Sequence, residues 1–380
     1  MRKGWEYKKL GEVCCPKSKI QRATKCFGAS DEISYIDISS IDNSVQEVNS
    51  ITSFTMSNAP SRAQQKVEYG DIIVSTVRPN LKNVAFIKQH DSNLVASSGF
   101  CVLRTTDDIM RNYLFRYITS DIFTQHLMKL TTGANYPAVR DLDVRDSIIP
   151  LPPKSTQLSI VSELDKINEL IRLKKEQLKD FDNLAQSIFY EMFGDPVENE
   201  RGWEIKKLIK VSTLINGRAY KQNELLSEGK YKVLRVGNFF TNSNFYYSNL
   251  ELEDEKYCYK GDLLFAWSAS FGAFIWNEDK TIFHYHIWRV LFDKAILDIH
   301  YYQYLLNTMT SFFLNDVHGI GMVHLTKSGM EQYELPLPPL PLQHLFAQRI
   351  EQIEHQKAEV QKSITDLETL LASRMQYWFE

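Results

Sequence analysis

GWEYKKL at residues 4–10 recurs as GWEIKKL at residues 202–208, and this duplication decides the fold of the chain. Two further motifs recur in the same order, GD followed by two apolar residues and PLPPxxxQ. Their copies lie at residues 70–73 and 261–264, and at residues 150–157 and 336–343. A repeat of about 190 residues is much longer than a solenoid unit, and the whole chain of 380 residues exceeds the size of one ordinary hydrophobic core. We therefore expect two similar halves.

A heptad pattern begins after each PLPP motif, with positions spaced alternately by four and three residues. The first set is Ile160, Leu164, Ile167, Ile171, Lys174, Leu178, Phe181, Ala185 and Ile188, and the second is Phe346, Ile350, Ile353, Lys357, Val360, Ile364, Leu367, Leu371 and Arg374. Most of these positions are apolar, which is typical of a coiled-coil seam. The prolines mark where each helix begins. The pattern predicts two equivalent helices paired as an antiparallel coiled coil; two unrelated surface helices are the alternative.

The segments outside the heptads show the patterns of short strands and helices. Strand-like runs at residues 71–75 and 99–103 alternate with turn residues, and residues 113–128 are expected to form one helix. The fold class is therefore α+β, with two globular domains, a pair of long helices and a pseudo-two-fold internal repeat. We place the globular domains at 1–150 and 196–337, and the helical segments at 151–195 and 338–380. Because Trp378 and Phe379 occupy the place at which the first helix ends, the two chain ends should lie close together.

Composition is that of an ordinary soluble protein, with 43% apolar and 24% charged residues. No apolar run is long enough to cross a membrane, and the five cysteines form no C-x-x-C pair. We therefore expect a cytosolic chain with reduced cysteines. The net charge of −3 hides a local difference, because residues 1–150 carry 19 Lys+Arg against 16 Asp+Glu.

Motifs of common catalytic sites are missing from the sequence. There is neither a Walker A loop nor an H-E-x-x-H helix. The nearest approach to a metal site is His284 and His286 with His318 and His324, but two histidines at a spacing of two more often lie along a half-buried strand. Glu6-x-Lys8 and its copy Glu204-x-Lys206 resemble a fragment of a nuclease site, yet they more simply anchor an edge of the fold.

Polar side chains that suit DNA bases follow the first GD strand. The stretch STVRPNLKN at residues 75–83 offers arginine and asparagine, whose forked donors and amide groups match the major-groove edges of guanine and adenine. A solvated turn would show the same composition. Loops at 133–137 and 319–323 correspond to each other but carry different side chains, as expected of two readers of different sequences or of two structural loops. The DNA-binding candidates are Arg78, Asn80, Lys82, Asn83, Asn135, Tyr136 and Arg140, and in the second half Arg218, Tyr220, Lys221, Arg235, Asn238, Trp267, Ser268, Ser270, His286 and His324.

Taken together, the two GW-initiated halves, the GD strands, the PLPPxxxQ motifs and the long helices after them resemble the specificity subunit of type I restriction-modification systems, over essentially the full chain. The resemblance implies that residues 1–150 and 196–337 are target-recognition domains, each reading one half of a split, asymmetric DNA site. It also implies that the helices act as a spacer and dock two modification (methyltransferase) subunits. The positions assigned to the coiled coil and to docking are Ile160, Leu164, Ile167, Ile171, Leu178, Phe181, Ile350, Ile353, Val360, Ile364, Leu367 and Leu371.

The resemblance further implies the division of labour in the complex. This chain would be non-catalytic, with no cofactor or metal and no membrane partner. S-adenosylmethionine would be bound by the methyltransferase subunits, and ATP and Mg²⁺ would serve the partners, including restriction subunits that translocate along and cleave double-stranded DNA. The resemblance is weakest at residues 267–272, which follow the second GD strand and contain no arginine. Two alternatives stand beside this prediction: a stand-alone DNA-modifying or DNA-cleaving enzyme with a degenerate site, and a coiled-coil scaffold whose globular ends bind protein.

Overall fold

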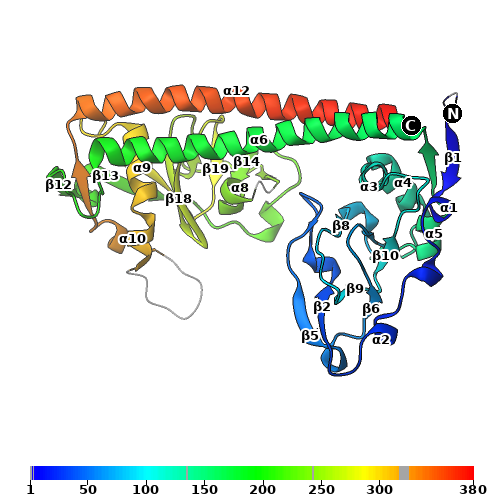
Figure 1. The fold of residues 1–380 in the computed structure, drawn as a ribbon. Coiled ribbons are helices and arrows are strands. Elements are labelled where there is room, and N and C mark those ends of the chain that lie inside the picture. Colours follow the sequence, from blue (N-terminus) through cyan, green and yellow to red (C-terminus); the bar gives the residue numbers. More distant parts are fainter. Residues whose placement is uncertain (1, 3, 134–135, 242–243, 316–324) are drawn as a thin grey trace. The chain divides into compact units, whose positions relative to one another are not determined.

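A computed structural model of the chain describes residues 2, 4–133, 136–241, 244–315 and 325–380 (Figure 1). It divides into two compact units. Unit 1 comprises Met1–Lys175 with Lys362–Glu380, and unit 2 comprises Glu176–Gln361. Two long helices, α6 (Lys154–Phe193) and α12 (Leu340–Phe379), each contribute to both units.

Unit 1 contains short strands and five short helices within its described residues. Its strands are β1 (Glu6–Lys9), β2 (Glu32–Ile36), β3 (Ile41–Asp42), β4 (Glu47–Val48), β5 (Thr52–Thr55), β6 (Ala63–Lys66), β7 (Ile72–Ser75), β8 (Val84–Phe86), β9 (Leu94–Ser97), β10 (Phe100–Leu103) and β11 (Ile148–Leu151). Its helices are α1 (Leu10–Val13), α2 (Ala23–Cys26), α3 (Arg111–Ile118), α4 (Asp121–Leu130) and α5 (Asp141–Arg145).

Unit 2 follows the same order. Its strands are β12 (Glu204–Lys207), β13 (Ser212–Asn216), β14 (Tyr231–Leu234), β15 (Tyr246–Ser248), β16 (Tyr257–Cys258), β17 (Leu263–Ser268), β18 (Ser270–Ile275), β19 (Thr281–Phe283), β20 (Ile287–Phe292) and β21 (Glu334–Leu337). Its helices are α7 (Leu208–Val211), α8 (Val236–Phe240), α9 (Ile299–Thr308), α10 (Thr310–Asn315) and α11 (Lys327–Met330).

The sheets of the two units match strand for strand. The order β5-β2-β9-β6 in unit 1 corresponds to β15-β14-β19-β16 in unit 2, and β10-β7-β8 corresponds to β20-β17-β18, to which unit 2 adds β13. In the first pair of sheets, β5-β2-β9-β6 and β15-β14-β19-β16, the central strands are parallel and the outer pairs are antiparallel. In the second pair of sheets all neighbouring strands are antiparallel. The first and last strands of each unit pair with each other, as β1 with β11 and β12 with β21. The predicted α+β fold and internal repeat are therefore confirmed.

The segment 113–128 forms two helices, so the prediction of a single helix is wrong. Helix α3 ends at Ile118, and Ser120 caps the start of α4 by accepting a hydrogen bond from the backbone amide of Phe123 (3.2 Å). The turn lets the ring of Phe123 pack against that of Tyr117, with 5.4 Å between centroids. Because this contact buries two aromatic rings, it outweighs the cost of interrupting the helix.

The glutamine of each PLPPxxxQ motif joins a long helix to its unit. Gln157 is buried; its side-chain oxygen accepts from the backbone amide of Met110 (2.9 Å) and its nitrogen donates to the carbonyl of Pro152 (2.9 Å). Gln343 repeats this with the amide of Asp298 (2.8 Å) and the carbonyl of Pro338 (2.8 Å), and donates also to the carbonyl of Ile296. Buried amides with all these partners fix the start of each helix against its unit.

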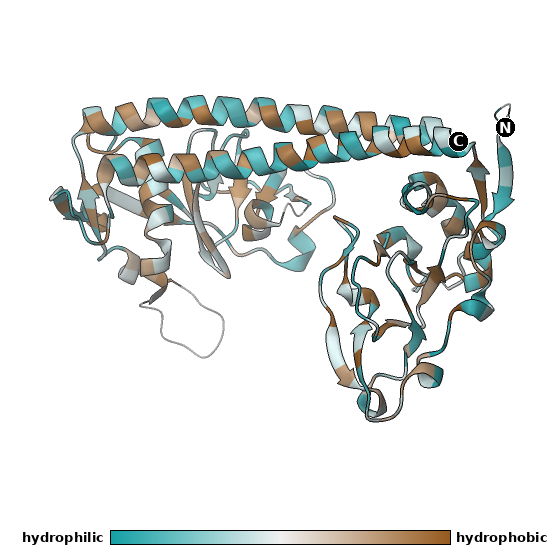
Figure 2. Cartoon of the chain, viewed as in Figure 1, coloured by the Kyte–Doolittle hydropathy of each residue, from teal (hydrophilic) through white to brown (hydrophobic). Residues whose placement is uncertain are grey.

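The long helices pack against each other in opposite directions. In unit 1, Glu163 of α6 pairs with Arg374 of α12, and Lys175 pairs with Glu368 (3.0 Å), so residue numbers rise on one helix as they fall on the other. In unit 2, Asp182 of α6 pairs with Lys357 of α12 (2.8 Å). Hydrophobic residues recur along both helices between hydrophilic ones (Figure 2), and every predicted seam position is buried or half-buried. The predicted antiparallel coiled coil is confirmed.

Residues from the two ends of the chain meet within unit 1. The indole rings of Trp5 and Trp378 stack with 6.4 Å between centroids, and the guanidinium of Arg2 lies 4.4 Å from the ring centroid of Tyr377. Phe379 is buried against Tyr113 and Tyr117. The predicted proximity of the two ends is therefore present. Among the described helices, none is both long and apolar enough to cross a membrane.

Candidate nucleic-acid interface

Two loops of unit 1 that the sequence analysis named separately are joined in the structure. Residues 76–83 connect β7 to β8, and the backbone amide of Arg78 donates to the carbonyl of Pro137 in the second loop (2.7 Å). Val77 and Ala138 form an isolated β-bridge beside this bond. The guanidinium carbon of Arg78 lies 4.4 Å from the ring centroid of Tyr136, whose side chain is 67% exposed. The two loops thus present an arginine held on an aromatic face.

Arg78 has a strained backbone at the tip of its loop. Its φ angle is +48°, in the left-handed region that costs a residue with a Cβ about 1–2 kcal/mol. Lys82, a few residues on, also has a positive φ of +50°. Such strain persists only where the surrounding contacts enforce it, and it often marks functional loops.

The other candidates of unit 1 differ in how far their side chains are already engaged. The ammonium of Lys82 pairs with Asp121 (2.6 Å), and the guanidinium of Arg140 forms two hydrogen bonds to Asp143 (2.6 and 3.1 Å). The Arg140 pair lowers the pKa of the Asp143 carboxyl. Asn80 is exposed and Asn83 is half-buried in the same loop. Arg78 therefore differs from Arg140, because no carboxylate among the described residues pairs with it.

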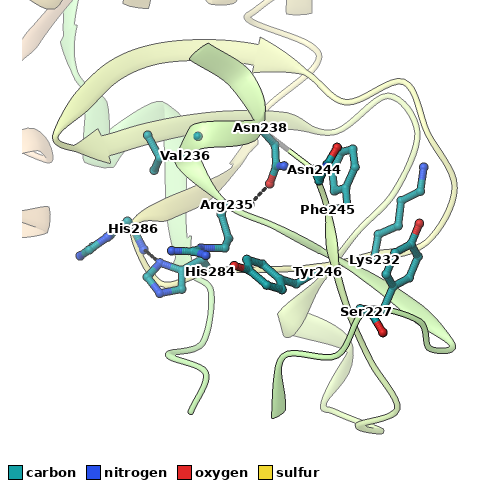
Figure 3. A pocket seen from close by; sticks show the side chains of 12 residues that line it. Ser227, Lys232, Arg235, Val236, Asn238, Asn244, Phe245, Tyr246, His284 and His286 are labelled. Carbon is teal, nitrogen blue, oxygen red and sulfur yellow. Dashed lines mark hydrogen bonds between the residues drawn. The ribbon is translucent and has the colours of Figure 1, made fainter. Parts of the chain in front are cut away.

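Unit 2 contains a cavity of about 1050 Å³ that is lined by both polar and aromatic side chains (Figure 3). It lies between the end of β14 with α8, the start of β15, and the turn that joins β19 to β20. Its lining includes three predicted residues, Arg235, Asn238 and His286. The sequence analysis named His284 only as a possible metal ligand, and it missed the others, which are Ser227, Lys232, Val236, Gly237, Asn244, Phe245, Tyr246 and Tyr247. The polar and aromatic run NFYYSN at residues 244–249 was the available signal for part of this wall.

Arg235 is the arginine that lines this cavity. It precedes α8, and its backbone amide donates to the side-chain oxygen of Asn238 (2.8 Å). Its guanidinium carbon lies 5.3 Å from the ring centroid of Tyr246, and no carboxylate among the described residues pairs with it. Lys232 is instead paired with Glu278. Arg235 therefore resembles Arg78 in two respects: its guanidinium lies near a tyrosine ring, and no carboxylate among the described residues pairs with it.

Both histidines of the cavity are half-buried, as expected, but only His284 continues a strand edge, through a β-bridge with Arg218, whereas His286 lies in the turn before β20. The chain reverses between β19 and β20, and this brings the rings of His284 and His286 to 4.8 Å between centroids. The pKa of His284 is lowered from 6.5 to about 4, first by burial and then by the positive charges of His286 and Arg235. His284 is consequently neutral at pH 7.

The metal hypothesis for these histidines has no support from neighbouring ligands. His318 and His324, which would complete the set, lie outside the described residues, as does Asn135. Within the part of the chain that is described, no three His, Cys, Asp or Glu side chains gather as a metal site. The Glu6–Lys8 and Glu204–Lys206 pairs are ion pairs along β1 and β12 (2.9 and 3.1 Å).

The remaining candidates of unit 2 lie elsewhere in the unit. Arg218 forms two hydrogen bonds to Glu224 (2.8 and 3.0 Å), while Lys221 is exposed and burial raises the pKa of Tyr220. The others form a tight hairpin between β17 and β18, where Ser268 is fully buried and its side chain therefore does not reach the surface. The indole of Trp267 donates to the carbonyl of Tyr285 (2.8 Å), and Ser270 is half-buried.

Arg78 and Arg235 come from two different loops, and each of these loops has a structural counterpart in the other unit. In unit 1 the amide of Thr76 donates to the carbonyl of Gly99 (2.9 Å), and in unit 2 the amide of Trp267 donates to the carbonyl of His286 (3.1 Å). The same offset places Ala269 at the position of Arg78. The capping bond of Arg235 to Asn238 is likewise matched in unit 1 by Asp37 and Ser40 (3.1 Å). Each unit thus supplies its arginine from a different one of two equivalent loops.

The chain thus consists of two similar α+β units, to both of which the long helices contribute, and each unit has an arginine that lies over a tyrosine ring. This duplication is typical of a protein with two related binding sites. The family described as "Type I restriction modification DNA specificity domain" matches residues 2–180 and 200–369, and the chain belongs to this family. The resemblance found in the sequence is confirmed, and the function that the comparisons support is DNA sequence specificity rather than catalysis.

Relatives and solved structures agree with this assignment. The MjaIX specificity subunit of Methanocaldococcus jannaschii is 23% identical over 324 residues, which covers 78% of this chain and 74% of the relative. The HindI specificity subunit of Haemophilus influenzae is 24% identical over 171 residues, covering 44% and 35%. One solved chain, from a study of complex assembly and conformational transition of the type I R-M system, aligns over 100% of this chain and 98% of its own, with 27% identity and a TM-score of 0.64. The type I S subunit from M. genitalium shares the fold (99% and 96% covered, 13% identity, TM-score 0.51).

Proposed function

We propose that unit 1 and unit 2 each read one half of a split, asymmetric site in double-stranded DNA. The observation that carries the proposal is the pair of arginines, Arg78 on Tyr136 and Arg235 on Tyr246, that face no carboxylate among the described residues. A guanidinium that is oriented by a ring and still has donors to spare can donate two hydrogen bonds to guanine O6 and N7 in the major groove. Arg140 and Arg218 are bound by carboxylates, so we assign them no base contact.

Neighbouring side chains would complete each reading surface. Asn80 and Asn83 in unit 1 and Asn244 in unit 2 carry amides that suit adenine. Because the two arginines come from different loops, the halves of the target should differ in sequence. In this proposal the similar sheets of the two units hold the loops in the same orientation, and the different side chains on these loops select different bases.

Methyltransferase subunits are the proposed partners on the long helices. The seam side chains face inward and are buried or half-buried, so docking would use the opposite face instead. Leu184 of α6 and Leu370 of α12 are equivalent in the repeat, and they are 47% and 46% exposed; Leu170 and Leu173 are 47% exposed on the same helix as Leu184. Two equivalent exposed leucines, one from each half of the repeat, suit two copies of one partner.

Catalysis and its cofactors belong, in this proposal, to the partner subunits. S-adenosylmethionine would be bound by the methyltransferase subunits, and ATP and Mg²⁺ by the partners that move along and cleave the DNA. The modest charge of the recognition segments limits the number of phosphates that this chain can neutralise alone. We therefore expect weak, salt-dependent DNA binding by the chain alone and tighter, specific binding by the complex with methyltransferase subunits.

Mapping of methylated bases in cells tests the two readers separately. Wild-type complex should methylate a two-part motif; Arg78→Ala should relax one part only, and Arg235→Ala the other part only, by about 1–3 kcal/mol at one base pair. Arg140→Ala and Arg218→Ala are the matched controls and should leave both parts unchanged. The proposal fails if Arg78→Ala and Arg235→Ala leave the motif intact in a folded complex, or if both alter the same part.

A further inference from the structure

A short segment of unit 1 concentrates positive charge. Residues 17–25 read KSKIQRATK, with four cations and no acid, although the whole of residues 1–150 has an excess of only three cations. Lys17 pairs with Asp141 (3.4 Å). Lys19, Arg22 and Lys25 are exposed, and no carboxylate among the described residues pairs with them.

The strand β6 lies beside this segment, with Arg62 directly before it and Lys66 at its end. The amide of Lys66 donates to the carbonyl of Gln21 (2.9 Å), and Arg22 forms a β-bridge with Gln65. Arg62, which immediately precedes β6, is exposed. Lys19, Arg22, Lys25 and Arg62 together are called the basic ridge below.

Hydrogen bonds connect the basic ridge to the loop of Arg78. The carbonyl of Arg62 accepts from the amide of Ser98 (2.7 Å), and the side chain of Gln65 donates to the carbonyl of Ser97 (2.9 Å). Gly99, which follows Ser98, accepts through its carbonyl from both the amide and the hydroxyl of Thr76, two residues before Arg78. These bonds join the segment that carries Arg62 to the loop that carries Arg78 within one framework.

The matching positions of unit 2 carry a different balance of charge. The strand that occupies the place of β6 is β16, and the segment before it, residues 251–256, reads ELEDEK, with four acids and one lysine. The counterpart of residues 17–25, residues 215–223, has two cations, and one of them, Arg218, pairs with Glu224. The two units thus differ in charge at the same position of the same sheet.

We infer that the basic ridge binds the phosphates of double-stranded DNA beside the half-site that unit 1 reads, and that unit 2 makes no matching contact. This rests on the proposed reading function and extends it to the flanking duplex. Lysine and arginine contacts to phosphates add affinity without sequence information, whereas base contacts set the sequence. The footprint of the protein should accordingly extend further at one half-site than at the other.

Salt-dependent binding by the complex with methyltransferase subunits tests the inference. The variant is Arg22→Gln/Lys25→Gln/Arg62→Gln, and the charge control is Lys154→Gln/Lys166→Gln, whose lysines are exposed on α6 of the same unit. Each lost phosphate contact should reduce the slope of log K against log salt by about 0.9, so the triple variant should lose about 2 to 3. Affinity for target and non-target duplexes should fall by the same factor, and the methylated motif should stay unchanged.

Duplex length provides the second measurement. Trimming the DNA flank next to the half-site of unit 1 should remove the difference between wild type and variant, and trimming the other flank should not. An unchanged salt slope in a variant whose circular dichroism matches wild type would overturn the inference, as would loss of complex assembly with normal DNA binding, since this would assign the ridge to an acidic protein surface. Failure of the reading proposal is recognised separately, by an unchanged motif in Arg78→Ala.

Discussion

Arg78 and Ala269 occupy the same position in the two units, and both have a left-handed backbone, with φ angles of +48° and +65°. The framework therefore enforces the strained turn whether or not the side chain at its tip can reach a base. In unit 1 the tip carries the arginine, and in unit 2 the arginine comes from the neighbouring loop, at Arg235. The strain at this turn is therefore a property of the fold, whereas the proposed base contact follows the loop that holds the arginine.

Substituting Ala269 and Arg78 by glycine, one at a time, should distinguish the effect of backbone strain on stability from the effect of the arginine side chain on the methylated motif. Ala269→Gly should stabilise the chain by about 0.5–1 kcal/mol, because relief of the left-handed backbone exceeds the entropy that glycine loses on folding. The methylated motif should not change. Arg78→Gly relieves the same strain but should relax one part of the motif. Urea denaturation and methylome mapping measure the two effects, and a relaxed motif in Ala269→Gly would contradict this assignment.

Acid should destabilise unit 2 through His284. The pKa of this imidazole is about 4 in the folded chain and 6.5 when unperturbed, so between these values the unfolded chain binds a proton that the folded chain does not. The stabilising contribution is therefore complete above pH 6.5 and is lost as the pH falls towards 4. His284→Gln should flatten the pH dependence of the melting temperature in this window. His355→Gln, at an exposed position of α12, is the control and should leave it unchanged.

Removing the two helix-anchoring glutamines should destabilise the chain unequally. Gln157→Leu leaves one amide and one carbonyl without a partner, and Gln343→Leu leaves one amide and two carbonyls. At about 1–3 kcal/mol for each buried group, Gln343→Leu should cost more. Gln352→Leu, on the exposed surface of α12, should have little effect. Chemical denaturation of the three variants would refute this account if Gln157→Leu were the most destabilised.

A circular permutant should keep both fold and target. Joining Glu380 to Met1 by a short linker, beside the stacked Trp5 and Trp378, and opening the chain between Asp195 and Arg201 changes few contacts. The indole of Trp203 already donates to the carbonyl of Phe193 across this second connection (2.9 Å), and it can hold the new ends in place. The permuted complex should methylate the same motif as wild type. An insoluble permutant, alongside a soluble chain that carries only the linker sequence as a tail, would count against the cyclic arrangement.

Shortening both helices tests whether they set the distance between the half-sites. Removing the facing heptads 178–184 and 357–363 takes out the Asp182–Lys357 pair together and leaves the Glu163–Arg374 and Lys175–Glu368 pairs in place. Seven residues of helix correspond to about 10 Å, or about three base pairs of DNA. The two half-site sequences should stay the same while the spacer in the methylated motif becomes shorter. A folded, active variant with the original spacer would show that another feature fixes the distance.

The sequence predicted the internal repeat and the helical seam, but it did not predict features that depend on how particular side chains pack in three dimensions. The heptads predicted the seam because helical periodicity is visible in sequence, and Arg78 was found because it lies in a polar run after a buried strand. Arg235 was identified, but its cavity was not, because Tyr246 and His284 come to it from segments that lie far apart in the sequence. The break between α3 and α4 was missed because a buried serine that caps a helix resembles a serine inside one. Ser268 was named as a DNA-binding candidate because its burial depends on the packing of the hairpin between β17 and β18, which the sequence pattern does not show.

The pairing of β1 with β11, and of β12 with β21, brings together the two ends of each globular segment. Each segment enters and leaves its unit through one two-stranded ribbon, so the segment is a cassette with adjacent ends. The GW and PLPP motifs that border the cassette are nearly identical in the two copies. A segment from another member of the family, joined at these borders, would replace one set of loops while the ion pairs of the long helices stay matched. Each half of the chain can therefore be exchanged without redesign of the other half.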